Sequence, residues 1–231
     1  MIGLAIPMLN EEQNVQPVLE EICTVLTTAK IPFKIAAVNN GSSDGTHAKI
    51  IEMSQQNPNI IPIHLPVNQQ YGGGILAGMR ILESDNPTVI GWMWGDGQIS
   101  PAILPTLYQQ CQNGSDIAKA KRITRQDGTQ RKIISNTYAL VMSSLGIKTP
   151  DVNGCPKLFR FSVWKQLALQ RTDWFLDAQA ILQAEQMNLS ITDHPATMKK
   201  RQFGKSKVNW KTVAEFSINI ARWKWKNTKF Y

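Results

Sequence analysis

The sequence has few cysteines, no long apolar run and a shortage of acidic residues, and each shortage excludes a class of protein. The three cysteines are odd in number and lack metal-site spacings, so neither a disulfide framework nor a zinc site is expected, and a reducing cytoplasm is favoured. No apolar run approaches the ~20 residues of a membrane-spanning helix. The opening "MIGLAIP" lacks the basic and apolar regions of a secretory signal. Any contact with a membrane is therefore expected to be peripheral.

Lysine and arginine outnumber aspartate and glutamate by 25 to 17, which gives a net charge of +8. Such an excess favours anionic partners: nucleic acid, lipid headgroups or phosphorylated small molecules. No aromatic-rich sheet motif or recognition-helix pattern is present, so nucleic acid is not expected as a partner. At 231 residues and 42% hydrophobic composition, the chain has the size of one large α/β domain.

Short apolar runs alternate with amphipathic stretches through the first half of the chain. The pattern predicts strands at 3–7, 33–38, 60–65 and 88–94, with helices between them, the third of which follows the glycines at 72–74. In the second half we expect strands near 116–122 and 151–160, helices at 132–146 and 175–187, and basic loops at 124–131 and 199–207. This rhythm predicts a mostly parallel sheet with helices on both faces.

Three polar turns, at 7–12, 39–46 and 95–98, follow predicted strands. Ligands bind at the carboxyl ends of strands in such sheets, so Asp96, between Gly95 and Gly97, is placed at a binding edge. Mg²⁺ needs only one or two protein oxygens and takes its other ligands from water and substrate phosphates. Asp96 with the Gln98 carbonyl therefore suffices for a metal-diphosphate site. Asp-Gly is also a common turn pair, and taken alone the turn is the more frequent role.

Basic residues gather in the loops of the second half. Arginines bind phosphate through two parallel hydrogen bonds, so several of them together indicate a phosphorylated ligand, although a single arginine more often lies at a solvated surface. The candidates are Arg122, Arg125, Arg131 and Arg201, with Lys199, Lys200, Lys205 and Lys207 near the last.

The motifs follow one another in a recognisable order: "IPMLNEEQN", "VNNGSSDGT", a glycine turn "YGGGILAG", "GDGQISP", "KAKR", "RKIISN", "DVNGCPKLFR", "FLDAQAIL" and "RQFGKSK". Over roughly residues 2–208 this series resembles the inverting family 2 glycosyltransferases, and most of all the branch with dolichol-phosphate mannose synthase and polyprenyl-phosphate glycosyltransferases. The resemblance implies an α/β fold of the GT-A type in a single domain at 1–208. Its nucleotide-binding half is expected at 1–115 and its acceptor-binding half at 116–208, with a basic amphipathic helix and tail at 209–231.

The resemblance also implies roles for single residues. Catalysis is expected of Asp96, Arg122, Arg131, Asp151 and Arg201, and a Mg²⁺ or Mn²⁺ ion is expected on Asp96 and Gln98. The nucleotide is expected beside Pro7, Leu9, Asn10, Glu11, Asn39, Asn40, Gly41, Ser42, Gly72, Gly73 and Asp96. The acceptor phosphate is expected at Arg122, Arg131, Ser135, Arg201, Ser206 and Lys207. The implied partners are a nucleotide-diphosphate sugar and a polyprenyl phosphate of the dolichyl or undecaprenyl type.

The sequence departs from the family pattern at acidic positions. Trp94 replaces the first acid of the Asp-x-Asp segment, Asn39-Asn40 replaces an Asp-Asp pair, and Gln179 replaces a glutamate. Two interpretations follow: an active enzyme with an altered preference for base or sugar, or a degenerate glycosyltransferase-like binding protein. We favour activity because Asp96, Gln98, Asp151 and the set of arginines are all retained together. The lost acids need not abolish catalysis, since a phosphate monoester is already anionic at neutral pH and attacks without a strong general base. A sugar hydroxyl as acceptor is a further alternative, with Glu11, Asp151 or Asp177 as helpers.

Residues 208–226 are compatible with a helix that carries apolar residues on one stripe and cations on other faces. Basic residues beside tryptophans suit a helix in a membrane interface. The alternative is a terminal helix that packs on its own domain or on a second subunit, so a homo-oligomer is possible. With the expected lipid acceptor, the protein is predicted to be cytoplasmic and peripheral at the inner face of the membrane.

Overall fold

The computed structural model describes residues 1–125 and 147–203. The helix predicted at 132–146 and the segment 209–231 lie outside the described residues, as do four candidate site residues: Arg131, Ser135, Ser206 and Lys207. The division of the chain into a 1–115 half, a 116–208 half and a tail stays a prediction.

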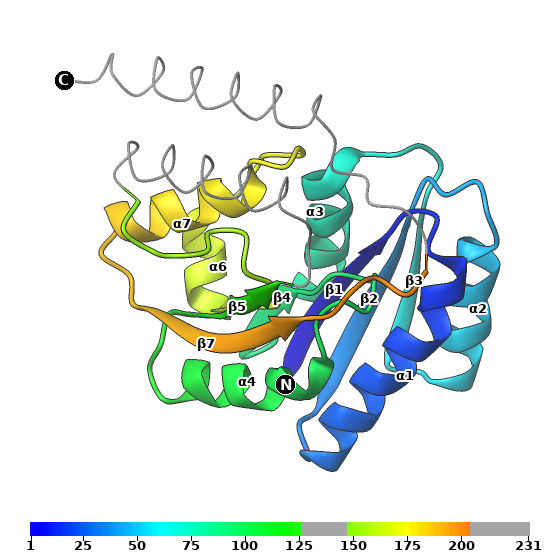
Figure 1. Ribbon diagram of the computed structural model, residues 1–231, viewed down its shortest axis with the longest axis horizontal. Helices are drawn as coiled ribbons and strands as arrows, with labels where there is room; N and C mark the ends of the chain where they lie inside the picture. The colour runs from blue at the N-terminus through cyan, green and yellow to red at the C-terminus, as the bar shows by residue number, and fades with distance from the viewer. Residues whose placement is uncertain (126–146, 204–231) are drawn as a thin grey trace.

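A seven-stranded sheet runs through the molecule in the order β3-β2-β1-β4-β6-β5-β7 (Figure 1). Neighbouring strands are parallel except at β6, which is antiparallel to β4 and to β5. The strands are β1 (Ile2–Met8), β2 (Phe33–Asn40), β3 (Ile60–Leu65), β4 (Val89–Trp92), β5 (Ile117–Arg125), β6 (Lys157–Arg160) and β7 (Ile191–Met198). The predicted, mostly parallel sheet is confirmed.

Helices cover both faces of this sheet because side chains alternate between the faces along each strand. In β1, Leu4 and Ile6 join a core with α1, α2 and α4, whereas Ala5 joins a core with α3, α6 and α7. The helices are α1 (Glu12–Thr28), α2 (Thr46–Gln56), α3 (Gln70–Glu83), α4 (Leu104–Gln112), α6 (Phe161–Leu167) and α7 (Leu176–Gln186), with a short 3-10 turn at Pro101–Ile103. Within the described ranges no helix is both long and apolar enough to cross a bilayer.

The glycine turn predicted before α3 is wrong, because the helix begins at Gln70 and contains Gly72, Gly73 and Gly74. These glycines allow a close approach of a later loop. A Cβ on Gly72 would lie 2.3 Å from the carbonyl oxygen of Arg171, and the Gly73 amide donates to the Thr172 carbonyl at 2.8 Å.

Two described elements, α6 and β7, were not predicted from the sequence. Strand β7 pairs in parallel with β5, from Ile117 opposite Ile191 to Arg125 opposite Met198. Its sequence, "ITDHPATM", carries few apolar residues and a proline, which an edge strand accepts because one of its sides needs no backbone donors. Strand β7 leads directly to residue 199 and so brings the basic loop to the sheet.

The order of strands around β1 creates the binding edge. From β1 the chain winds outward to β2 and β3, and then returns to β4 on the other side of β1. The carboxyl ends of β1 and β4 therefore border a topological switch point, where open α/β sheets bind ligands. The turns after β1, β2 and β4 are the three polar turns that the sequence placed there.

Candidate active site

The turn after β4 is built to hold Asp96 against the end of β1. A Cβ on Gly95 would lie 2.6 Å from Met8 Cγ, so only glycine lets the turn pack over β1. Gly97 has φ of 68°, a left-handed conformation that glycine adopts without strain. The Gln98 amide then donates to Asp96 Oδ1 at 3.1 Å. The two glycines and this hydrogen bond fix the position of the carboxylate.

The turn after β1 interlocks with the turn after β2. The Asn10 amide donates to Ser42 Oγ at 2.9 Å, and the Ser43 amide donates to Asn10 Oδ1 at 2.8 Å. The Glu11 amide donates to Thr46 Oγ1 at 2.8 Å. The two predicted nucleotide-binding turns therefore form one rigid unit.

A small polar cavity of about 190 Å³ lies beside this unit. Its wall includes Asn10, Glu11 and Asp44 from the interlocked turns and Phe203 from the segment after β7. The Phe203 side chain is exposed. The cavity shows that the two halves of the sequence meet at the predicted nucleotide side of the sheet.

Asn39 and Asn40 are buried, and protein atoms engage their side chains. The Asn39 carboxamide contacts His64 Nδ1 at 2.8 Å and accepts from the Ser42 amide at 3.0 Å. Asn40 Nδ2 donates to the Gln70 carbonyl at 2.8 Å, and its oxygen accepts from the Gln69 amide. Asn40 thus uses both a donor and an acceptor, which aspartate does not offer. The amides shape the base turn, and their contact with a nucleotide stays a prediction.

Arg201, from the segment after β7, reaches the carboxylates of two other turns. Its Nη2 lies 2.7 Å from Asp96 Oδ2, and its Nη1 lies 2.9 Å from Glu11 Oε1. Burial raises the pKa of Asp96, and the ion pair with Arg201 limits the rise. Gln98 strengthens the same junction through two hydrogen bonds with Lys199. Its side-chain Nε2 donates to the Lys199 carbonyl at 3.0 Å, and its backbone carbonyl accepts from the Lys199 amide at 2.8 Å.

The Asp96 turn fits a hard divalent cation that also binds a diphosphate. It offers a carboxylate oxygen and the side-chain carbonyl of Gln98, the oxygen donors that Mg²⁺ and Mn²⁺ prefer. Among residues 1–125 and 147–203, no cluster of three or more His, Cys, Asp or Glu side chains is placed to hold a metal ion. The donor set therefore suits an ion that takes most of its ligands from phosphate and water.

Trp94, which replaces an acid of the family pattern, begins a chain of hydrogen bonds. Its indole N–H donates to the Tyr71 hydroxyl at 3.0 Å, and this hydroxyl donates to Asp177 Oδ2 at 2.9 Å. The other oxygen of Asp177 pairs with the buried Lys157 ammonium. Burial and the charge of Asp177 raise the pKa of Tyr71 well above its ordinary value, so the hydroxyl stays protonated.

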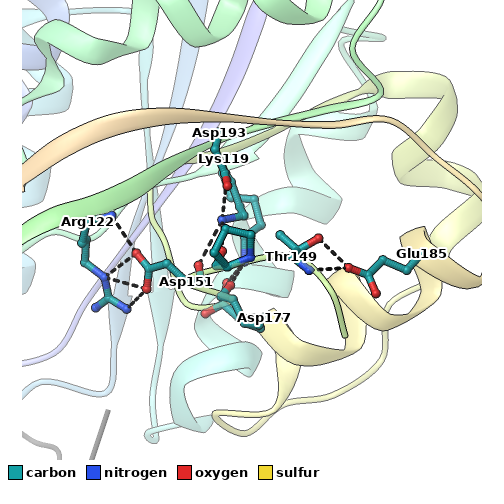
Figure 2. A network of polar contacts seen from close by, with 10 residues as sticks. Lys119, Arg122, Thr149, Asp151, Asp177, Glu185 and Asp193 are labelled. Carbon is teal, nitrogen blue, oxygen red and sulfur yellow. Dashed lines mark hydrogen bonds and ion pairs between the residues drawn. The ribbon is translucent and has the colours of Figure 1, made fainter. Parts of the chain in front are cut away.

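Arg122 and Asp151 lie together, close to Trp94. The Arg122 guanidinium donates to both oxygens of Asp151, and its backbone amide donates to Oδ2 at 2.7 Å (Figure 2). Burial opposes the charge of Arg122, but the contacts with Asp151 outweigh it and raise the pKa of the guanidinium. The guanidinium carbon lies 5.4 Å from the centre of the Trp94 ring. Asp151 thus neutralises Arg122 and holds it over the indole.

Behind this pair, two buried lysines face each other across β5 and β6. Lys119 and Lys157 are register partners, and neither is exposed to solvent. Lys119 Nζ lies 2.7 Å from Asp193 Oδ1 and donates to the carbonyls of Pro150 and Asp151 (Figure 2). Burial lowers the pKa of Lys119. These contacts fix the 150–152 backbone, which carries Asp151.

The order of the strands and the carboxylate-lined edge at the switch point define an open α/β protein with a candidate ligand-binding edge. Residues 4–168 match the family described as Glycosyl transferase family 2. The chain belongs to this family.

Its relatives include sugar transferases with polyprenyl substrates. It is 30% identical over 155 residues to an uncharacterized glycosyltransferase of Synechocystis sp., covering 66% of this chain and 48% of that protein. It is 28% identical to an undecaprenyl-phosphate 4-deoxy-4-formamido-L-arabinose transferase of Photorhabdus laumondii, covering 67% and 47%. A polyprenol monophosphomannose synthase of Mycolicibacterium smegmatis is 24% identical over 230 residues, covering 94% and 84%. The chain spans about half the length of the first two relatives.

Solved structures share the fold at low sequence identity. Glucosyl-3-phosphoglycerate synthase of Mycobacterium tuberculosis, in complex with Mn²⁺, UDP and phosphoglyceric acid, aligns with a TM-score of 0.60 at 15% identity, covering 89% of this chain and 72% of that one. A mannosyltransferase of Pyrobaculum calidifontis, in complex with GDP-mannose and Mn²⁺, aligns with a TM-score of 0.60 at 11% identity, covering 88% and 58%. The predicted GT-A fold is confirmed.

The structure brings Glu11, Asp96, Gln98 and Arg201 into one cluster and places Arg122 with Asp151 in another. Gly72 and Gly73 lie in α3 under the 171–173 loop, and Gln179 Oε1 accepts from the Arg171 amide of this loop at 3.1 Å. Tyr71 and Lys119 were missed from the sequence. Both open quoted motifs, "YGGGILAG" and "KAKR", but a motif does not reveal a partner more than 70 residues away, such as Asp177 for Tyr71 or Asp193 for Lys119.

Proposed function

We propose that the protein transfers one sugar, with inversion, from a nucleotide-diphosphate sugar to a polyprenyl phosphate. The observation that carries the proposal is the meeting of Asp96, Glu11 and Arg201 at the switch point beside the interlocked nucleotide turns. The polyprenyl-phosphate transferases among its relatives support the acceptor class. Two carboxylates and an arginine suit a site that handles a metal-bound diphosphate and a second phosphate.

In the proposed reaction, an oxygen of the acceptor phosphate forms a bond to the anomeric carbon while the bond from that carbon to the donor diphosphate breaks. The nucleoside diphosphate leaves with the electron pair. A bound divalent cation, Mg²⁺ or Mn²⁺, supplies charge neutralisation for this leaving group. Asp96 and Gln98 would hold the cation, Arg201 would orient the acceptor phosphate, and the interlocked turns would hold the nucleoside.

The acceptor requires no strong general base, because the phosphate monoester is ionised at neutral pH. This agrees with the acids that surround the site. Asp151 is paired with Arg122, and Asp177 is paired with Lys157 and Tyr71, so neither carboxylate is poised to take a proton. A sugar hydroxyl as acceptor is less favoured for the same reason. We further propose that the protein works at the cytoplasmic face of a membrane, where its lipid acceptor lies.

The test replaces Asp96 by asparagine, which keeps the size of the side chain and removes its charge. We expect turnover of the cognate donor with a short polyprenyl phosphate to fall by about 100-fold or more, as for the loss of a group that stabilises developing charge. The stabilisation of the fold by nucleotide sugar with Mn²⁺, measured as a thermal shift, should also disappear.

Asp85→Asn is the matched control. Asp85 is exposed and precedes β4, so it lies at the opposite end of this strand from Asp96. If Asp96→Asn behaved like this control, the metal assignment would fail. If the natural sequence bound a nucleotide sugar but transferred nothing to any polyprenyl phosphate, the degenerate binding protein would replace the enzyme.

A further inference from the structure

Arg201 pairs with two carboxylates at once, although a phosphate would be the expected partner of an acceptor-site arginine. The contacts of Nη2 with Asp96 and of Nη1 with Glu11 use both ends of the guanidinium. The three side chains are mostly buried, with relative exposures of 19% for Arg201, 12% for Asp96 and 6% for Glu11. Ion pairs that are mostly shielded from water resist screening by salt. The Arg201 guanidinium therefore occupies the carboxylate oxygen that a cation bound to Asp96 would also need.

The two carboxylates are not held in the same way. Glu11 is fixed by its backbone contact with Thr46 and by Asn14 Nδ2, which donates to Glu11 Oε2 at 2.6 Å. Asp96 receives the Gln98 amide on Oδ1 and Arg201 on Oδ2. A divalent cation on Asp96 would compete with Arg201 for this carboxylate, because two cations repel each other at such distances. Glu11 would still bind Nη1.

The segment that carries Arg201 is attached to the Asp96 turn independently of this ion pair. The two hydrogen bonds between Gln98 and Lys199 join the turn and the segment two residues before Arg201. When Nη2 leaves Asp96, the backbone at residue 199 can therefore stay in place. A rotation of one side chain suffices, and Nη2 remains beside the site with its donors released.

We infer that Glu11 is a positioning residue for Arg201, and that Arg201 and the divalent cation compete for Asp96. This inference rests on the proposed function. The cation that arrives with the donor displaces Nη2, while Glu11 retains Nη1 and keeps the released donors near the reacting phosphates. Acceptor phosphate therefore binds more tightly when a divalent cation occupies Asp96 and the donors of Nη2 are released.

The first test measures Mn²⁺ binding to the full chain without any substrate, by water-proton relaxation. Arg201→Gln should bind Mn²⁺ about fivefold more tightly or better than the natural sequence, the lower end of ordinary coupling between sites. Arg80→Gln is the matched control, because it removes the same side chain from an exposed position in the last turn of α3, outside the candidate site, and should leave the affinity within about twofold of natural. Equal affinities in all three proteins, or Mn²⁺ binding to none of them, would overturn the competition.

The second test measures the affinity for farnesyl phosphate by calorimetry, with and without Mn²⁺. In the natural protein and in Arg80→Gln, Mn²⁺ should tighten binding about fivefold or more, because coupling is reciprocal. In Glu11→Gln, most of this increase in the affinity for farnesyl phosphate should be lost while Mn²⁺ binding persists. In Arg201→Gln, the whole increase should be lost. If Mn²⁺ tightened the binding of farnesyl phosphate to Glu11→Gln as much as to the natural protein, Glu11 would not be a positioning residue for Arg201.

Neither test requires turnover, so the inference and the proposed function fail separately. Sugar transfer to polyprenyl phosphate without any coupling between Mn²⁺ and farnesyl phosphate would leave the function and overturn the competition at Asp96. Coupling without sugar transfer would leave the competition at Asp96 and overturn the function.

Discussion

Gly97 and Gly114 both have positive φ, 68° and 111°, but only Gly97 belongs to the site. An alanine at either position is strained, and we expect each substitution to lower the free energy of unfolding by about 1–2 kcal/mol. Gly97→Ala should in addition weaken Mn²⁺-dependent binding of nucleotide sugar, because relief of the strain turns the Asp96 carboxylate out of place. Urea unfolding measures the first effect, and a thermal-shift titration measures the second.

Gly114→Ala is the control for this prediction, since a Cβ there would meet no atom within 4 Å. It should share the loss of stability and keep the binding. If both variants bound the donor as well as the natural protein, the left-handed residue would matter only for folding.

Single residues also mark the limit of what the sequence predicts. The motif series placed Asp96 at a turn between glycines, and this position is confirmed. The sequence also showed an indole where an acid was expected, but the reason lies in Tyr71, whose hydroxyl accepts the Trp94 N–H. Contacts between residues so far apart depend on how helices and strands pack, and a single sequence carries no direct trace of them.

At the scale of elements, β5 and β6 place two buried ammonium groups side by side. Lys119→Met would remove the cation that faces Asp193 and two backbone carbonyls. We expect a loss of about 3–5 kcal/mol in the free energy of unfolding, because the partners of a broken buried pair are left uncompensated. The midpoint of urea unfolding, compared at constant slope, measures this loss.

The double variant Lys119→Met/Asp193→Leu separates pairing from packing. Removal of both charges should recover part of the loss, since an apolar pair of similar size often equals a buried ion pair in stability. A double variant less stable than Lys119→Met alone would mean that Asp193 contributes through other contacts.

The predictability of the elements follows from how each is buried. Strands β1, β2 and β4 and the helices beside them were predicted because strands inside a parallel sheet are apolar on both faces and their connections amphipathic. Strand β3 lies at the other edge, but its run "IIPIHL" is still mostly apolar. Strand β7 lies at the edge, with polar residues and Pro195, and therefore lacked that signal. Asp96 and Arg201 were both expected in the catalytic site, but their direct ion pair was not predicted, because β7 is the element that carries the chain there.

At the scale of the whole molecule, the net charge of +8 predicts how the full chain meets a lipid surface. We expect it to cosediment with vesicles that contain anionic phosphatidylglycerol and to remain in solution with neutral phosphatidylcholine vesicles. The bound fraction should fall steeply between 50 and 500 mM salt, roughly as the Debye length shrinks from ~14 to ~4 Å. Equal binding to neutral vesicles at high salt would point to insertion of apolar side chains in place of electrostatic attraction.

The ion pairs of Arg201 also have a consequence for protein synthesis. Glu11 and Asp96 leave the ribosome long before residue 201, and β7, the strand that precedes Arg201, can pair with the sheet only after residue 198 has been synthesised. Until then a nascent chain with β1 to β4 in place holds two close carboxylates without their cation, and like charges so near each other repel. A divalent cation bound at this stage would relieve the repulsion, so the metal ion would assist folding of the first half before it takes part in any chemistry.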